Sequence, residues 1–438
     1  MVERKRVGVI SLGCDKNRVD TEKMLAILSK KHTIVSDICQ AEIIIINTCA
    51  FLESARTEAI NEILSANEYK KSGSAEKLIV TGCLPQKFVD ELFDELVEVD
   101  AFLGVSDYDK LLKVIDKTYS GARVNAVGSV KGECGKKRVL TTNGYAYLKI
   151  ADGCSNHCTY CLIPYIRGAY RSVPVEDLIK ETKALGKVNE LILVAQDTAK
   201  YGQDLVPKSS LVELVKELSK LKNVRYIRLL YCYPENITQE LIDEFKTNDK
   251  LIKYVDIPLQ HADDKILKLM NRKGTGQVYL NLINKLKREV QGIAIRSTFI
   301  TGFPRESEEA FNKLVAFIKN AELFNAGFFK YSREDGTAAA RLDGQIDEKI
   351  KDKRLKALYA AQKKVATKLN KAQVGKTLSV LAEGFDSEQL VYYGRAYFNA
   401  PDIDGKVYFF SDDEIVYGKY YKIKINEATG YDLYGERI

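Results

Sequence analysis

Short aliphatic and β-branched runs alternate with amphipathic segments along the first part of the chain. The runs, at 7–12, 42–47 and 77–81, are too short for buried helices and favour strands. Segments with a helical repeat follow them at 20–30, 54–69 and 87–96. Because apolar strands that alternate with helices form parallel sheets covered on both faces, we expect residues 1–120 to form a doubly wound parallel α/β domain.

A second series of strands and helices begins at residue 145. Its strand candidates are 145–150, 190–195, 224–230, 253–258, 294–300 and 326–331, and helical candidates lie between them at 175–185, 210–221, 239–245, 277–289 and 308–320. Six strand–helix units predict an open, partial (βα)6 barrel over 141–373, with functional residues at the carboxyl ends of its strands. The charged stretch 347–373 is expected to be a helix that packs across this barrel.

The last part of the chain, 374–438, changes to short β-patterned runs at 378–382, 406–410 and 420–425. This pattern predicts a small antiparallel β-barrel, of an OB-like class that often binds nucleic acid. Its seven basic and eleven acidic residues leave it at net −4, against +11 for the rest of the chain. An acidic module repels phosphate backbones, so a basic protein partner suits it better than direct nucleic-acid binding. An ordinary acidic surface without a partner is the alternative.

Composition narrows the class of protein. The 438 residues are 45% hydrophobic, enough for two or three domains with cores. No apolar segment follows the charged N-terminus, and the longest aliphatic run, 43–46, cannot span a bilayer, so we expect a cytoplasmic protein without a membrane partner. The stretch 121–140, rich in Gly, Lys and Arg, predicts a linker. Nine cysteines, an odd number, favour metal-binding or catalytic thiols over disulfides.

Three of these cysteines, Cys154, Cys158 and Cys161, form a C-x3-C-x2-C loop directly after the strand candidate 145–150. Thiolates are the ligands of iron–sulfur clusters, and three of them leave one iron of a four-iron cluster open for chemistry. Zinc is the alternative, with His157 as a fourth ligand. It is disfavoured because zinc prefers paired C-x2-C knuckles and a closed ligand set.

Three further cysteines, Cys14, Cys49 and Cys83, each end one of the first three strand candidates, at separations of 35 and 34 residues. The carboxyl ends of parallel strands share one edge, so these thiols are expected to meet in space. We interpret them as a second three-cysteine cluster site, with three buried structural cysteines as the alternative. The remaining cysteines, Cys39, Cys134 and Cys232, are predicted to be unliganded.

Several longer segments, together with the two cysteine patterns, resemble the radical SAM (S-adenosylmethionine) methylthiotransferases along nearly the whole chain. The matching segments are 11–20, 47–49, 196–198, 256–261, 296–304, 402–405 and 431–435. The family has a three-cysteine domain, a radical SAM partial barrel and a TRAM-type β-barrel in this order. The Gly-Cys-x-Lys-Asn-x-Val-Asp segment at 13–20 is similar to the type that modifies ribosomal protein S-twelve rather than tRNA. Arg305 and the segment 172–174 depart from the family pattern, so the resemblance does not predict the local contacts at these positions.

The resemblance implies a mechanism and its cofactors, two 4Fe-4S clusters and SAM. The cluster on Cys154, Cys158 and Cys161 would reduce SAM to a 5′-deoxyadenosyl radical, which takes hydrogen from the β-carbon of an aspartate of ribosomal protein S-twelve. The cluster on the other three cysteines would carry a sulfur that a first SAM methylates. An unactivated C–H bond lies beyond acid–base catalysis, which fits a cofactor radical. The residues expected to contact SAM are Tyr160, Gln196, Asp197, Arg296 and Thr298.

The expected partners are ribosomal protein S-twelve, bound through the acidic C-terminal domain, and an electron donor such as flavodoxin or ferredoxin. Two other functions stay open. One is the same chemistry on an adenosine of tRNA, against which the acidic tail and the 13–20 segment argue. The other is a non-catalytic iron–sulfur electron-transfer protein, against which two open-iron sites argue.

Overall fold

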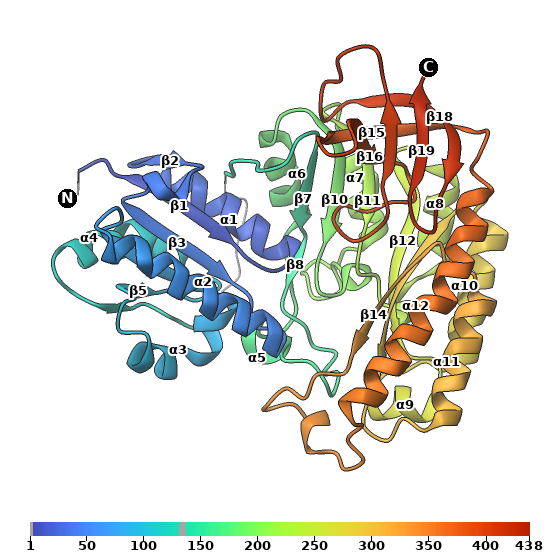
Figure 1. Cartoon of the computed structure of the whole chain (residues 1–438), viewed down its shortest axis with the longest axis horizontal. Coiled ribbons are helices and arrows are strands. Elements are labelled where there is room, and N and C mark those ends of the chain that lie inside the picture. Colours follow the sequence, from blue (N-terminus) through green and yellow to red (C-terminus); the bar gives the residue numbers. More distant parts are fainter. Residues whose placement is uncertain (1–2, 131–136) are drawn as a thin grey trace.

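The computed structural model describes residues 3–130 and 137–438, and its first part is a doubly wound parallel sheet (Figure 1). All of its strand pairs are parallel, in the order β2-β1-β3-β4-β5-β6. The strands are β1 (Arg6–Ser11), β2 (Thr33–Val35), β3 (Ile43–Thr48), β4 (Lys77–Gly82), β5 (Ala101–Phe102) and β6 (Val124–Asn125). Helices α1 (Asp15–Leu28) and α4 (Leu111–Tyr119) cover one face, and α2 (Glu53–Lys71) and α3 (Cys83–Glu95) cover the other. The predicted fold class of this part is confirmed.

The pattern of hydrophobic residues explains which strands could be predicted from the sequence. Strand β3 is buried on both faces, so its aliphatic residues form one continuous run rather than an alternation. Strands β2, β5 and β6 are only two or three residues long, too short for a periodic signal, and the sequence prediction missed them.

The central part is an open half of a barrel. Its parallel strands pair in the order β14-β13-β12-β11-β10-β7, and β7 and β14 stay apart as the two edges. The strands are β7 (Tyr145–Lys149), β10 (Val188–Val194), β11 (Val224–Leu229), β12 (Leu251–Gln260), β13 (Ala294–Thr301) and β14 (Asn325–Lys330). The helices are α5 (Ile163–Arg167), α6 (Val175–Ala184), α7 (Leu211–Ser219), α8 (Gln239–Thr247), α9 (Asp264–Leu269), α10 (Gly276–Glu289), α11 (Glu308–Ala321) and α12 (Glu348–Lys371). The predicted partial barrel is confirmed, and α12 packs along β14 and α11.

The C-terminal part is a closed barrel in the order β15-β16-β17-β19-β18. Its strands are β15 (Thr377–Asp386), β16 (Val391–Arg395), β17 (Val407–Phe410), β18 (Tyr420–Ala428) and β19 (Leu433–Arg437). One pair differs from the predicted antiparallel arrangement, because β17 and β19 run parallel, with Val407 opposite Leu433. Side-chain alternation has a period of two whichever way a strand runs, so it could not reveal this direction.

The C-terminal barrel sits at one end of the central sheet, against inward-facing residues that the helices leave free (Figure 1). One hydrophobic cluster joins Tyr147, Ile192 and Tyr254 of the sheet to Leu378 and Phe398 of the C-terminal part. Outward residues of the same strands pack against helices in a separate cluster. Asn189 near the start of β10 donates to the Gly418 carbonyl, and Asn325 at the start of β14 donates to the Phe398 carbonyl. The barrel therefore packs where these strands begin, and the loops at the carboxyl ends stay available for a site.

The predicted linker contributes to packing where it enters the central part. Arg138 is buried, forms ion pairs with Glu22 of α1 and Glu181 of α6, and donates a hydrogen bond to the carbonyl of Tyr147. It therefore fastens the first part to the second. Cys134 lies outside the described residues. None of the helices in the described ranges combines the length and apolar character needed to cross a bilayer.

Candidate cluster sites

Cys14, Cys49 and Cys83 lie together at the carboxyl edge of the N-terminal sheet. They follow β1, β3 and β4, and the strand order reverses between β1 and β3, where parallel α/β sheets place their ligands. Cys83 is buried, Cys49 half-buried and Cys14 exposed. Burial raises the pKa of the Cys83 thiol to about 12; Arg167 opposes this rise, and the Cys14 and Cys49 thiols add to it. The three thiols are thus close enough to interact electrostatically, as their strand-end positions predicted.

A glycine permits this close approach. Gly13 precedes Cys14 and has φ +87, a conformation that L-residues with a side chain rarely adopt. A Cβ atom at Gly13 would lie 2.7 Å from Cys49 Cβ and 3.1 Å from Cys49 Sγ. The backbone of one cysteine loop therefore passes directly against the side chain of the next.

Cys154, Cys158 and Cys161 lie on the loop that leaves the first strand of the partial barrel. The short strands β8 (Ala151–Asp152) and β9 (Arg171–Ser172) pair at the base of this loop, and the Cys154 N–H donates to the Gly168 carbonyl at 3.0 Å. The backbone N–H groups of Asn156 and Ile163 donate to the sulfur atoms of Cys154 and Cys161, both at 3.5 Å. These hydrogen bonds close the base of the loop and orient the thiols of Cys154 and Cys161.

The donor sets fit iron–sulfur clusters, because thiolate is the ligand that such clusters use. Among residues 3–130 and 137–438, no group of three or more His, Cys, Asp or Glu is spaced to hold one metal ion. In a four-iron cluster each thiolate binds a different iron, so three ligands stand further apart than around a single zinc ion. The structure brings the three thiols of each triad near one another, and their role as cluster ligands stays a prediction.

Gln196 and Asp197, two of the predicted SAM contacts, lie beside the second cysteine loop. The Gln196 side-chain amide donates to Asp152 at 3.3 Å, and its Oε1 atom is buried without a hydrogen-bond partner among the described residues. The buried Asp197 carboxylate accepts hydrogen bonds from Asn156 of the loop and from Asn236. Burial raises the pKa of Asp197. An unpartnered acceptor next to the loop is compatible with a polar ligand there.

The other predicted SAM contacts have different surroundings. Arg296 forms ion pairs with Asp256 at 2.9 Å and with Asp404 of the C-terminal part at 3.2 Å, and it also donates to the Thr298 hydroxyl. Its guanidinium is buried and joins two parts of the molecule rather than facing solvent. Tyr160 is half-buried and packs on the cluster that contains Ile266 and Met270. Contacts of these residues with SAM stay predictions.

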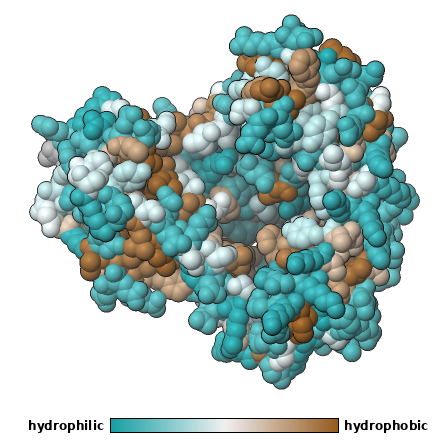
Figure 2. Space-filling view, viewed as in Figure 1, coloured by the Kyte–Doolittle hydropathy of each residue, from teal (hydrophilic) through white to brown (hydrophobic). Residues whose placement is uncertain are grey.

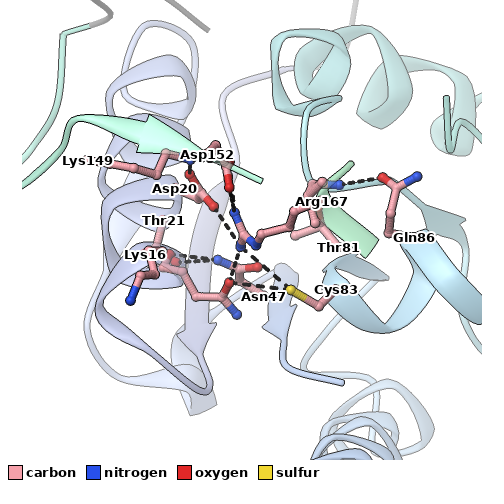
Figure 3. Close-up of polar contacts among 12 residues, drawn as sticks. Lys16, Asp20, Thr21, Asn47, Thr81, Cys83, Gln86, Lys149, Asp152 and Arg167 are labelled. Atoms are coloured by element: carbon pink, nitrogen blue, oxygen red, sulfur yellow. Dashed lines mark hydrogen bonds and ion pairs between the residues drawn. The ribbon is translucent and has the colours of Figure 1, made fainter. Parts of the chain in front are cut away.

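A buried ionic network connects the two cysteine sites (Figure 3). Arg167, the last residue of α5, donates to the Cys83 sulfur at 3.6 Å and to Asn17 at 2.6 Å. The same guanidinium pairs with Asp20 at 3.2 Å and with Asp152 at 3.0 Å. Lys149 also pairs with both carboxylates.

Nothing in the sequence singles out Arg167, Asp152 or Lys149, because a charged residue carries no sign of burial there. Asn17 and Asp20 belong to the segment 13–20 that carried the resemblance, and the structure shows what they do. Asn17 also donates to the carbonyls of Leu12 and Thr48 and so holds the first two cysteine loops together. Figure 2 shows the surface hollowed between the N-terminal part and the partial barrel.

A parallel half-barrel with a C-x3-C-x2-C loop after its first strand defines the radical SAM class of proteins. In agreement, residues 148–318 match the Radical SAM superfamily, residues 374–438 match the TRAM domain, and residues 6–104 match the Uncharacterized protein family UPF0004. The chain is 46% identical over 99% of its length to "Ribosomal protein uS12 methylthiotransferase RimO" of Clostridium botulinum strain Hall, of which the match covers 98%. It is 47% identical to the proteins of the same name from Acetivibrio thermocellus and Thermoanaerobacter sp. strain X514, over 99% of this chain and 99% and 100% of theirs. The chain belongs to the RimO family.

Solved structures show the same fold at low sequence identity. The cobalamin-dependent S-adenosylmethionine radical enzyme OxsB, with aqua-cobalamin bound, superposes with a TM-score of 0.52 at 13% identity. The match covers 82% of this chain and 56% of OxsB, so the chain spans little more than half of that protein. This likeness concerns the fold alone.

Proposed function

We propose that this chain is a radical SAM enzyme that adds a methylthio group to the β-carbon of an aspartate in ribosomal protein uS12. The observation that carries the proposal is the full-length similarity to RimO proteins, combined with cysteine triads at the carboxyl ends of two separate parallel sheets. The cofactors are SAM and two 4Fe-4S clusters. When bound, they supply a radical that removes hydrogen from an unactivated C–H bond, together with the sulfur and the methyl group that replace it.

The chain's own residues hold and separate these groups. Cys154, Cys158 and Cys161 are the proposed ligands of the cluster that works with SAM. The cysteines of the N-terminal sheet, Cys14, Cys49 and Cys83, are the proposed ligands of the cluster that carries sulfur. Three ligands each would leave one iron open in both clusters.

The proposed SAM-binding residues are Tyr160, Gln196, Asp197, Arg296 and Thr298. Gln196 and Asp197 are supported by their contacts with Asp152 and Asn156 beside the cysteine loop. Arg296 and Thr298 lie two residues apart on β13, and Arg296 donates to the Thr298 hydroxyl. Because Arg296 is already paired with two carboxylates, its part in SAM binding would be to shape the site rather than to supply a free cation.

The substrate protein would dock on the C-terminal barrel. Proteins that bind ribosomal RNA carry basic surfaces, and this barrel exposes acidic residues that complement them. Asp412 and Glu414 are exposed on the same loop as Asp413. The proposed reductant is a small electron donor such as flavodoxin or ferredoxin, and the proposed compartment is the cytoplasm, where ribosomal proteins are made. The proposed domain limits are 1–120, 141–373 and 374–438, with a linker at 121–140.

The deciding experiment compares substrates. Reduced, anaerobically reconstituted protein is incubated with SAM and either uS12 or tRNA, and both products are analysed by mass spectrometry. We expect a methylthio mass gain on an aspartate of uS12. A gain only on tRNA would assign the chain to adenosine modification, and the absence of 5′-deoxyadenosine from SAM would favour a non-catalytic electron-transfer protein.

A further inference from the structure

Arg167 links the two cysteine sites. Its backbone belongs to the segment that follows Cys161, and its side chain contacts Cys83 of the N-terminal site. It lies six residues after Cys161 and ends α5. The next residue, Gly168, accepts the hydrogen bond from the Cys154 N–H that closes the barrel loop. The backbone of Arg167 is therefore held by the loop that carries Cys154, Cys158 and Cys161, which we call the radical SAM loop.

The side chain of Arg167 points toward Cys83 of the N-terminal site and toward Asp20 and Asp152 (Figure 3). It is about 1% exposed, so bulk solvent screens its charge very little. One terminal nitrogen lies 3.6 Å from Cys83 Sγ, and the same nitrogen donates to Asn17 at 2.6 Å, the residue that bridges the loops of Cys14 and Cys49. The other terminal nitrogen binds both oxygens of Asp152, at 3.0 and 3.2 Å. The guanidinium is thus fixed on both sides and cannot swing away from the sulfur.

The charges in the network beside Cys83 balance before the thiols are counted. Arg167 and Lys149 contribute two cations, and Asp20 and Asp152 contribute two carboxylates, all in one connected set. Arg167 is the member of this set that contacts a sulfur directly. The reduction potential of an iron–sulfur cluster responds to nearby charge, to hydrogen bonds on its sulfurs and to solvent exposure. The guanidinium acts through the first two.

We infer that Arg167 raises the reduction potential of the N-terminal cluster through its hydrogen bond to Cys83. It is a positioning residue, held in place by the radical SAM loop. This inference rests on the proposed assignment of Cys14, Cys49 and Cys83 as cluster ligands. A cation beside a ligating sulfur stabilises the more negative, reduced state of the cluster. The two sites are therefore structurally linked, because the segment that follows one cysteine loop carries the charge that tunes the other site.

The test measures a potential and needs no turnover. In a full-length variant with Cys154→Ala, Cys158→Ala and Cys161→Ala, only the N-terminal site can take up a cluster, and its midpoint potential is measured by redox titration with electron paramagnetic resonance detection. Adding Arg167→Gln should lower the reduction equilibrium constant about tenfold, which is about 59 mV for a one-electron couple. Adding Asp20→Asn instead should raise the potential, because it removes the anion paired with Arg167.

Opposite shifts from two neighbouring substitutions separate an electrostatic role from a structural one. Arg228→Gln is the matched control: Arg228 is equally buried but pairs with Glu190, away from the cysteines, and its loss should leave the potential unchanged. Equal potentials in the Arg167→Gln variant and its parent would overturn the inference. If the Arg167→Gln variant fails to take up iron, Asp20→Asn decides: an upward shift supports the inference, and no shift refutes it. A parent without any cluster would refute the ligand assignment and the inference together.

Discussion

At the scale of single residues, the N-terminal cysteine site depends on a close backbone approach at Gly13 and on the buried cation of Arg167. The 2.7 Å approach that Gly13 permits and the buried charge of Arg167 depend on segments far apart in the chain.

The Gly13→Ala substitution is expected to remove the N-terminal cluster alone. The new methyl group would strike Cys49, and the positive φ would add about 1 kcal/mol of backbone strain. Iron content should fall from about eight to about four per chain, while reductive cleavage of SAM continues. Gly73→Ala is the matched control, since Gly73 has φ +81 and its new methyl group would have no atom of the described residues within 4 Å. Loss of iron in both variants would point to general strain instead.

The two cysteine triads should separate by function. Cys154→Ala is expected to abolish the formation of 5′-deoxyadenosine, because it removes a ligand of the cluster proposed to reduce SAM. Cys14→Ala should keep SAM cleavage but lose methylthio transfer. Chromatography of nucleoside products and mass spectrometry of uS12 measure the two activities, and retention of transfer in both variants would refute the two-cluster assignment.

At the scale of elements, strands with a buried face and helices with a long apolar repeat were predicted well, and very short elements were not. The aliphatic run of β3 and the strands of the partial barrel were recognisable because burial on both faces leaves continuous apolar runs. The pairing of β17 with β19 had no such signal. Contacts between elements, such as those of the buried Glu190 carboxylate on β10, had no signal in the sequence either.

Glu190→Gln should destabilise the junction between the partial barrel and the C-terminal barrel. The Glu190 carboxylate binds Arg228 at 2.5 Å and Arg395 of β16 at 3.1 Å, and all three are buried. Loss of one partner from such a group costs about 3 kcal/mol, measured as a lower urea midpoint. Glu217→Gln, at an exposed pair with Lys220, should change the midpoint little.

The same carboxylate predicts a pH dependence. Burial alone would raise the pKa of Glu190, but Arg228 and Arg395 outweigh burial and the net shift is downward from 4.5. Its stabilising contribution is therefore present above about pH 4.5 and is lost as the pH falls through the lowered value. The stability difference between the parent and Glu190→Gln should shrink on acidification below that pH, and a constant difference would contradict this account.

At the scale of the whole molecule, the arrangement of three parts decides which surfaces are free. The C-terminal barrel packs at one end of the central sheet, and the N-terminal sheet lies beside the cysteine loop (Figure 1). The surface is hollowed between the N-terminal part and the partial barrel (Figure 2). Charge is divided in the same way, with an acidic C-terminal barrel on an otherwise basic chain.

This division predicts salt-sensitive binding of uS12. Replacing the exposed Asp412 and Glu414 with Asn and Gln should weaken binding about fivefold, on the order of 1 kcal/mol, and reduce its dependence on salt concentration. The double substitution of Asp94 and Glu95, exposed on α3 of the N-terminal part, is the charge-matched control. Titration of labelled uS12 at several salt concentrations measures both effects, and equal weakening in both variants would argue against docking on the C-terminal barrel.

The sequence alone determined the fold class, the order of the three parts and the positions of six cysteines at strand ends and in one loop, because periodic burial and local spacing are properties of neighbouring residues. The tertiary structure alone decided that Arg167 reaches Cys83, that Arg296 binds Asp404 and that Arg138 anchors the linker. The physical reason is that burying a charge costs free energy unless the charge is paired. The folded structure decides which residue forms the pair, and that residue lies tens to hundreds of positions away in the chain.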